Sequence, residues 1–431
     1  MKASKSARAD GAVANIINKQ PIPRFCRVKQ VFDDYKICDV ENEVRQKLQR
    51  PGTLDRIGKG QRIAITAGSR SVANIARIIK TIVDETKKAG GQPFIVPSMG
   101  SHGGATAEGQ AEVIATYNIT EETMGCPIIS NMETVQIGIT QDGKPVRIDK
   151  NAFEADGIIV VGRVKPHTSF QGKYESGLVK MTTIGLGKQF GAEICHAEGF
   201  GQMGKNITNF AKVIYKNCKV LFGVATVENA HDETRRIEAI PVECIFDEEP
   251  ALLEEARKHM PSILFKDLDV LIVDEIGKNF SGDGMDPNIT GTFCTPYVKG
   301  GSNQQRTVVL DICEESHGNG IGLGMADFSV QRAFDKMDFE MTYPNSLTCT
   351  VTCTGKLPII LATDRLAIQA AIKTCNFIDF NNPKIVRLKN TLKVEEIYIS
   401  EGLLEEANHN RKIIVLSEPS ELEFDEFGNL F

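Results

Sequence analysis

The chain has 431 residues and a formal net charge of −6, with 41% hydrophobic and 25% charged residues. This length exceeds one ordinary hydrophobic core, so we expect a globular protein of two domains. The acidic balance argues against a nucleic-acid partner, because phosphate backbones bind to basic surfaces. No apolar run approaches the roughly 18 residues of a membrane span. The N-terminus, MKASKSARADGAVANII, also lacks the apolar core of a signal peptide, so we expect no membrane partner.

Cysteine usage favours a cytoplasmic protein. The eleven cysteines are scattered between Cys26 and Cys375 without a CxxC pair. This pattern fits reduced, partly buried thiols better than a disulfide framework. Cys349 and Cys353 lie four residues apart in an expected strand. We interpret them as packing residues rather than metal ligands, since free cysteine is often buried.

A strand–helix–strand unit is the first strong pattern along the chain. The residues before it are interpreted as irregular, apart from a polar helix at residues 41–49. Residues 62–66 and 93–97 form strand-like runs, and the residues between them have apolar side chains at helical spacing after Ser71, the predicted N-cap. A right-handed crossover makes the two strands parallel. The loops after both strands then lie at one carboxyl edge, where open α/β sheets bind ligands.

Both of these loops carry residues suited to an acidic ligand. The first, TAGSRS, places Thr66, Ser69 and Arg70 at the start of a helix, where backbone N–H groups and the helix dipole favour a phosphate or carboxylate. A plain helix cap with a surface arginine fits the same residues. The second loop, PSMGSHGG, holds His102 among glycines, and its imidazole changes charge near neutral pH.

The stretch of residues 157–196 concentrates the chemistry of the chain. A buried strand at residues 158–161 leads through Pro166 into a glycine-rich segment. That segment carries two histidines and three lysines, which are His167, Lys173, Lys180, Lys188 and His196. Imidazoles and amines are rarely buried without a partner, so we interpret this stretch as the active-site segment.

The remaining pattern completes two α/β domains. A hairpin near residues 128–148 precedes the active-site stretch, and a helix at 205–216, a strand at 219–229 and a helix at 250–259 follow it. The second domain is expected to contain strands at 267–277, 307–312, 347–352 and 357–362, a helix at 364–375, and a closing hairpin made by IVRLKN and EEIYIS. A loop rich in Gly, Asp and Asn, residues 278–291, follows its first strand and is long enough to be functional.

We therefore predict an α/β fold with two domains, residues 1–264 and residues 265–431, and largely parallel sheets. The N-terminal domain is expected to be the catalytic one, because it contains the active-site stretch. Polar, glycine-rich loops of the two domains are expected to face one another. Since interdomain clefts are favoured ligand sites, we predict the active site in such a cleft.

Three histidines form the centre of the predicted site: His102, His167 and His196. As three ligands they would make a zinc site, although their spacings of 65 and 29 residues match no compact metal motif. Two of them acting as acid and base on opposite faces of a substrate is equally good chemistry. Spacing does not choose between the two interpretations.

The segment VKPHTSFQGKYESGLVKMTTIGLGKQFGAEICH, with TAGSR and PSMGSHGG upstream, resembles the lactate racemase family. Members of that family use a nickel-pincer nucleotide, which is a nickel pyridinium-3,5-bisthiocarboxylic acid mononucleotide. The resemblance implies an isomerase, a racemase or epimerase of a 2-hydroxy acid that abstracts and returns hydride. It implies His102 and His167 as the two acid–base residues, Lys180 as the covalent tether of the cofactor, and His196 as the nickel ligand.

The resemblance also assigns the first loop and the partners. Thr66, Ser69 and Arg70 would contact the cofactor, and the planar fork of Arg70 suits the substrate carboxylate. Separate maturation enzymes would supply the cofactor. Lys173, which lies between His167 and Lys180, is a rival tether.

The composition of the second domain gives a prediction about the substrate. The chain has no Trp, and the loop of residues 278–291 is rich in hydrogen-bonding residues and poor in aromatic ones. This composition predicts a 2-hydroxy acid larger or more polar than lactate, such as a sugar acid, with Lys278 and Asn288 as further substrate contacts.

Two other classes of function remain open. A zinc or iron hydrolase would use the three histidines as metal ligands and keep a fourth position open. A non-catalytic protein that binds acidic or phosphorylated ligands would need only Ser69 and Arg70.

Overall fold

The computed structural model describes residues 6–69 and 72–431, and the contacts within the chain divide it into two units. Unit 1 joins Met1–Phe32 to Pro261–Phe431, and unit 2 is Asp33–Met260. The sequence places every residue before 265 in one domain. The structure differs at the N-terminus because β1 (Phe25–Gln30) pairs on both sides with strands from the end of the chain, β14 (Glu396–Ser400) and β15 (Ile413–Val415).

Unit 2 is built on a mostly parallel sheet. Over the described residues, its five strands run in the order β3-β2-β6-β7-β8, and only the β7–β8 pair is antiparallel. These strands are β2 (Arg62–Ala67), β3 (Gln92–Pro97), β6 (Gly157–Arg163), β7 (Val220–Glu228) and β8 (Thr234–Pro241). A separate antiparallel hairpin consists of β4 (Thr134–Ile139) and β5 (Pro145–Asp149). The predicted parallel pairing of the first two strands is confirmed.

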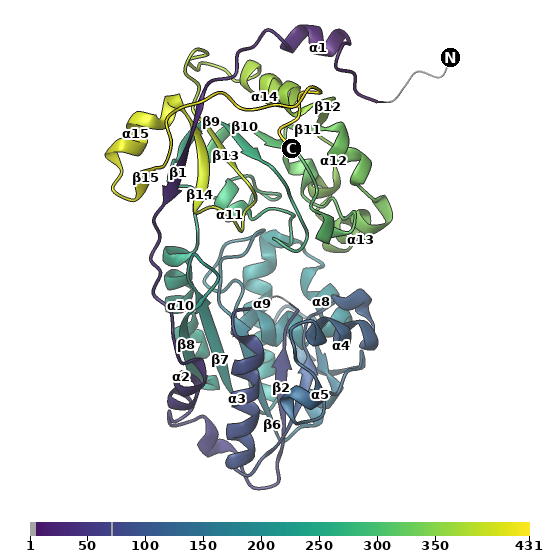
Figure 1. Ribbon diagram of the computed structural model, residues 1–431. Coiled ribbons are helices and arrows are strands. Elements are labelled where there is room, and N and C mark those ends of the chain that lie inside the picture. Colours follow the sequence, from purple (N-terminus) through teal and green to yellow (C-terminus); the bar gives the residue numbers. More distant parts are fainter. Residues whose placement is uncertain (1–5, 70–71) are drawn as a thin grey trace. The chain divides into compact units, whose positions relative to one another are not determined.

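Helices cover both faces of this sheet. They are α2 (Val40–Lys47), α3 (Ile75–Lys88), α4 (Ala107–Ala115), α5 (Glu121–Met124), α6 (Lys150–Glu154), α7 (Leu178–Lys180), α8 (Lys188–His196), α9 (Met203–Asn217) and α10 (Ile245–His259). Figure 1 shows α3 beside β2 and α10 beside β7. The helix α3 begins after its N-cap Asn74, and Ser71, the predicted cap, lies outside the described residues.

Successive side chains of each strand point to opposite faces of the sheet, so unit 2 has a hydrophobic core on each face. Ile63 and Ile65 of β2 face a core with the apolar stripe of α3, whereas Ala64 between them faces a second core with α9 and α10. In β6, Ile159 belongs to the first core and Ile158 to the second. A strand buried on both faces reads as a continuous apolar run, which is why the sequence revealed these strands.

Unit 1 contains a mixed sheet. Over the described residues, its eight strands run in the order β12-β11-β10-β9-β13-β14-β1-β15. The pairs from β12 to β13 are parallel and those from β13 to β15 antiparallel. Besides β1, β14 and β15, the strands are β9 (Asp267–Val273), β10 (Asn303–Val309), β11 (Phe328–Val330), β12 (Ile359–Leu361) and β13 (Ile385–Leu388). The helices are α1 (Ala12–Ile17), α11 (Pro287–Thr290), α12 (Gln331–Lys336), α13 (Phe339–Cys349), α14 (Asp364–Lys373) and α15 (Leu404–His409).

Two predictions that concern the strands of unit 1 are wrong. The first 60 residues are not irregular outside one helix, because β1 forms a ladder with β14 and β15. Residues 347–352 are not a strand, because Asp338 caps α13 and that helix continues to Cys349. Residues 347–352 include β-branched side chains, which favour a strand locally. Tertiary contacts override that preference. The closing hairpin is confirmed as the antiparallel pair β13–β14.

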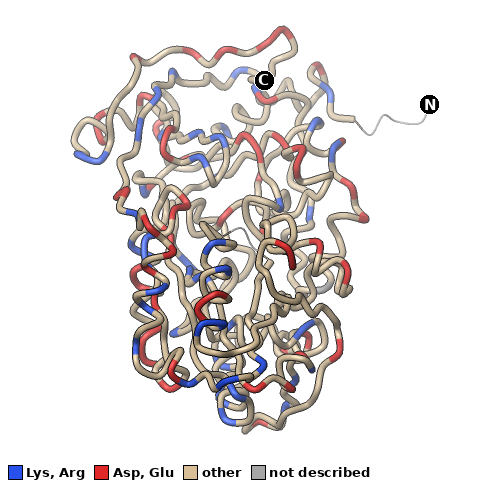
Figure 2. Tube along the Cα trace, turned by 60° about the horizontal axis from the view of Figure 1, so that its bottom comes forward, with Lys and Arg blue, Asp and Glu red and all other residues tan. Residues whose placement is uncertain are grey.

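Charged residues of both signs are interspersed along the chain, as Figure 2 shows. Several form ion pairs between elements of unit 2, such as Arg50 with Glu248 at 2.6 Å. None of the described helices combines the length and the apolar character needed to cross a bilayer.

Candidate active site

Parallel pairing brings the loops after β2, β3 and β6 to one edge of the unit 2 sheet. Ala67 and Pro97, the last residues of β2 and β3, stand opposite each other in the ladder. Just beyond them, the Ser69 hydroxyl forms a hydrogen bond with Nδ1 of His102. The hydroxyl of Tyr117 donates to the carbonyl of Ser69 at 2.9 Å. Two residues predicted for the site are therefore direct neighbours, while Arg70, predicted beside them, lies outside the described residues.

Thr66 serves the sheet itself. Its side chain is fully buried, and its hydroxyl oxygen accepts a hydrogen bond from Val161 N–H at 2.8 Å. The same hydroxyl donates to the Val161 carbonyl at 3.3 Å. These contacts join β2 to β6, and a contact between Thr66 and a cofactor stays a prediction.

A buried carboxylate shapes the loop that carries His167. The backbone N–H of His167 donates to Oε2 of Glu175 at 2.7 Å, and that of Gly172 donates to Oε1 at 3.0 Å. Arg257 pairs with the same carboxylate. Within the loop, Ser169 N–H donates to Nδ1 of His167 at 3.0 Å. Since Nδ1 accepts this bond, the hydrogen of the neutral imidazole lies on Nε2.

His196 ends α8 with its ring in a defined state. Its Nδ1 lies 2.6 Å from the Ala192 carbonyl, which only accepts, so Nδ1 carries the hydrogen. Burial lowers the pKa of His196, and the positive charge of Lys180 lowers it further. The imidazole is therefore neutral at neutral pH, with its lone pair on Nε2. Donation of the other ring N–H to a backbone carbonyl is a common feature of metal-binding histidines.

One phenylalanine contacts both of these histidines. The ring centroid of Phe200 lies 5.9 Å from that of His167 and also 5.9 Å from that of His196. Phe170 completes the group, 4.5 Å from His167 and 6.3 Å from Phe200. We call these four rings the aromatic cluster. It makes neighbours of two predicted site residues that lie 29 positions apart in the sequence.

Lys180 ends α7 and is followed by a π-helical turn, η3 (Met181–Gly185). At the start of α7, Val179 N–H donates to Oε2 of Glu249 at 3.0 Å. Glu249 is buried, and burial raises its pKa to about 7. The positive charge of Lys180 also contributes to the lowered pKa of His196. Lys173, by contrast, is exposed, with its ammonium 5.4 Å from the ring centroid of Tyr174.

The substrate residues predicted in the second domain belong to unit 1. The Lys278 ammonium donates to the Gly282 carbonyl at 2.7 Å. The Asn288 side-chain amide donates to Oδ1 of Asp286 at 3.1 Å. These contacts shape the loop of residues 278–291, and a role for either residue in substrate binding stays a prediction.

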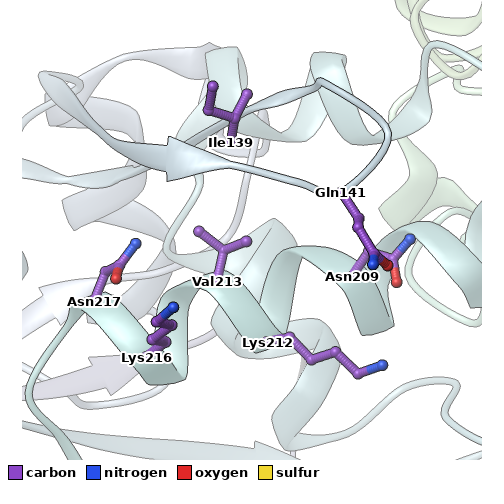
Figure 3. Close-up of a pocket in the computed structure, with 7 residues that line it drawn as sticks. All are labelled: Ile139, Gln141, Asn209, Lys212, Val213, Lys216 and Asn217. Carbon is purple, nitrogen blue, oxygen red and sulfur yellow. The ribbon is translucent and has the colours of Figure 1, made fainter.

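A surface pocket of unit 2 lies elsewhere. Figure 3 shows it between the end of the β4–β5 hairpin and α9. Its lining residues are Ile139, Gln141, Asn209, Lys212, Val213, Lys216 and Asn217. None of the residues predicted for the active site is among them.

The sequence interpretation missed the aromatic and acidic residues that support the site. Phe170 follows His167 by three positions and Phe200 follows His196 by four, so short separation from each histidine was a usable signal. Glu175 and Glu249 gave no such signal, because nothing in a sequence marks a carboxylate that will be buried against backbone N–H groups. Among the described residues, no group of three or more His, Cys, Asp or Glu side chains is arranged to hold a metal ion.

Comparison with known proteins gives similarities to a family model and to solved structures. Residues 21–208 match the family model of the lactate racemase N-terminal domain, a range that spans His102, His167, Lys180 and His196. The chain is also similar to the solved structure of the lactate racemase apoprotein from Thermoanaerobacterium thermosaccharolyticum, with 14% identity and a TM-score of 0.49. That alignment covers 78% of this chain and 88% of the other. The search of curated proteins finds no match.

Proposed function

We propose, from the premise that residues 21–208 place this chain in the lactate racemase family, that the protein is a racemase or epimerase of a 2-hydroxy acid. The proposed cofactor is the nickel-pincer nucleotide, held by Lys180 and His196. His102 and His167 are the proposed acid and base. The observation that carries the proposal is the aromatic cluster, in which Phe200 contacts both the proposed nickel ligand and a proposed acid–base histidine.

The residues present fit such a cofactor. Nickel needs a neutral imidazole, and burial lowers the pKa of His196 and so favours the neutral ring. The bond from Nδ1 to the Ala192 carbonyl leaves the lone pair on Nε2. A thioamide-type link needs an amine, and Lys180 supplies one whose positive charge lowers the pKa of His196. The two thiocarboxylate groups of the cofactor offer sulfur donors of their own, so one protein ligand suffices where no three-residue metal group exists among the described residues.

The histidines then handle protons. When bound, the cofactor supplies the hydride acceptor and donor that removal of hydrogen from an unacidic carbon requires. One imidazole takes the proton of the substrate hydroxyl, and the other returns a proton when the opposite configuration forms. The bonds of Nδ1 to Ser69 in His102 and to Ser169 in His167 orient the two rings for this exchange.

A chiral assay of nickel- and cofactor-loaded protein on a panel of 2-hydroxy acids tests the function. The panel includes lactate and several sugar acids, because the loop of residues 278–291 favours a polar substrate. We expect interconversion of the two configurations at the hydroxyl-bearing carbon of one panel member. Ala at either His102 or His167 should lower the rate by about 100-fold or more while the cofactor stays bound.

Mass spectrometry of the loaded protein tests the tether. The cofactor mass is expected on the peptide that contains Lys180, to persist in K173R and to disappear in K180R. Stoichiometric zinc with an unmodified Lys180 would instead support the hydrolase. Ligand binding that survives H102A and H167A, without stereochemical exchange for any acid, would support a binding protein.

A further inference from the structure

Lys188 is a lysine of the active-site stretch to which the proposed function gives no role. It begins α8, and its side chain is fully buried together with that of Asp149. Its backbone φ is +53°, a left-handed conformation that costs an L side chain about 1 kcal/mol. Glycine would adopt this conformation without that penalty, so the side chain must offset both the backbone strain and the burial of an ammonium group.

The contacts of the ammonium group show how the burial is offset. Nζ donates to the Pro97 carbonyl at 2.5 Å and to Oε1 of Gln110 at 3.1 Å, and it lies 3.3 Å from Oδ2 of Asp149. Two of the three ammonium hydrogens therefore have acceptors, and the carboxylate of Asp149 balances the charge. Pro97 is the last residue of β3, so one of these bonds holds the start of the loop that carries His102.

The Gln110 side chain connects Lys188 to the backbone of His102. Because Lys188 only donates, the oxygen of the buried Gln110 amide must face it and the nitrogen must face away. That nitrogen donates to the Gly100 carbonyl at 2.9 Å and to the His102 carbonyl at 3.2 Å. Lys188 therefore holds the loop of residues 98–105 both at its start and, through Gln110, on either side of Ser101.

We propose that Lys188 is a positioning residue, which sets the place of the His102 imidazole through Pro97 and the Gln110 amide. Its burial keeps it from touching substrate. This inference rests on the proposed function only for its catalytic consequence, because the predicted effect on the His102 loop belongs to the protein without cofactor.

Two variants separate positioning from a general contribution to stability. K188M keeps the length of the side chain and removes the charge and the donors. Q110E keeps a partner for Lys188 but turns the donor that faces Gly100 and His102 into an acceptor, so it breaks only the link to the loop. K212M, at an exposed lysine of α9 in the same unit, is the control.

Hydrogen exchange and histidine NMR on the cofactor-free protein give readouts that do not depend on activity. Amides of residues 98–105 are expected to exchange roughly tenfold faster in K188M and Q110E, since each lost hydrogen bond contributes about 1 kcal/mol. Amides of β6 should exchange at the wild-type rate in Q110E, and the side-chain resonance of His102 should shift in both variants. In loaded enzyme, kcat should fall about 10- to 100-fold with KM little changed, because a small misplacement of a reacting group has effects of this size.

The results for Q110E and H102A distinguish the inference from its alternatives. Unchanged exchange in the loop and an unchanged His102 resonance in Q110E would overturn the inference, even if K188M unfolds. Equal acceleration across all of unit 2 in Q110E would also overturn it, because that result means a structural role. A third outcome is faster exchange confined to residues 98–105 in both variants, together with full activity of H102A. This outcome would keep Lys188 as the positioning residue and would refute the acid–base role of His102.

Discussion

Buried acidic and basic side chains hold the segments that carry the proposed catalytic groups. Glu175 binds the backbone of the His167 loop, Glu249 binds the start of the Lys180 helix, and Lys188 binds the loop of His102. A charge removed from water is unfavourable unless it is paired or hydrogen-bonded, so each of these groups requires its backbone partners in one place. The geometry of the site thus depends on residues that never contact the substrate.

Glu249 makes stability depend on pH. Burial raises its pKa from an ordinary 4.5 to about 7, so between these values the folded protein holds a proton that the unfolded chain releases. The free energy of unfolding should therefore fall as pH rises from about 4.5 to about 7, by roughly 3 kcal/mol at most. E249Q does not titrate and should lose this dependence. Calorimetric melting between pH 5 and pH 8 measures it.

The control for this prediction lies on the same helix. Glu254 is exposed, with 70% of its side-chain area accessible, so E254Q should keep the pH dependence of the wild type. A wild-type slope in E249Q as well would mean that other groups cause the pH dependence.

The pairing of parallel strands explains why Ser69 meets His102, but it does not explain how His167 and His196, which were also predicted in one site, come together. The first pair follows from parallel strands, because residues just beyond paired strand ends must lie at one edge. The second pair meets through Phe200, at the end of a helix whose direction no local pattern specifies. The burial of Lys188 has no signal in the sequence, because most lysines are exposed.

At the scale of elements, the loop after β3 has two adjacent glycines, of which one leaves room for a side chain and the other does not. Gly103 and Gly104 both have a positive φ, +66° and +64°. A Cβ at Gly103 would lie 2.6 Å from the carbonyl carbon of Gly109 and 2.7 Å from the nitrogen of Gln110, whereas a Cβ at Gly104 meets nothing within 4 Å. Backbone cannot move aside as a flexible side chain can, so only the first position is closed to alanine.

G103A should therefore harm the site more than G104A. We expect G104A to lower the free energy of unfolding by about 1 kcal/mol, the usual penalty of a left-handed alanine. G103A carries the same penalty and must also separate the His102 loop from α4, so loaded enzyme should lose activity only in this variant. Melting temperatures and rates of the two variants give the comparison, and equal activity would contradict it.

Strands with local signals were predictable, and elements defined by distant partners were not. β2, β3 and β6 are short apolar runs bounded by glycine or proline, and their ranges agree with the prediction to within two residues. β1 alternates weakly, and its partners lie more than 360 residues further along the chain. In α13 the cap Asp338 and the buried contact of Ser346 with Thr354 at 3.1 Å outweigh a local preference for a strand.

At the scale of the whole molecule, β1 belongs to unit 1 although unit 2 follows it in the sequence. Val28 of β1 is fully buried and stands opposite Ile397 of β14 and Val415 of β15. V28D would bury a carboxylate there, so we expect unit 1 to lose roughly 3 kcal/mol or more. Hydrogen exchange should accelerate in β13 and β14 and stay unchanged in β2 and β6.

The neighbouring Arg27 gives the control, because it is exposed on the other side of the same strand. R27Q should leave exchange in both units at the wild-type rate. Acceleration in β2 and β6 of V28D would mean that the two units unfold together.

Because β1 lies between β14 and β15, it pairs only after the end of the chain has been synthesised. All of unit 2, Asp33–Met260, leaves the ribosome while the partners of β1 are still untranslated. At roughly 5–20 residues per second, the strand waits on the order of tens of seconds with its hydrogen-bonding edges unpaired. Unpaired strand edges recruit other strands, so the nascent chain presents an aggregation site for as long as β14 is missing. Slow codons anywhere between β1 and β14 should therefore lower the yield of folded protein, because they lengthen this wait.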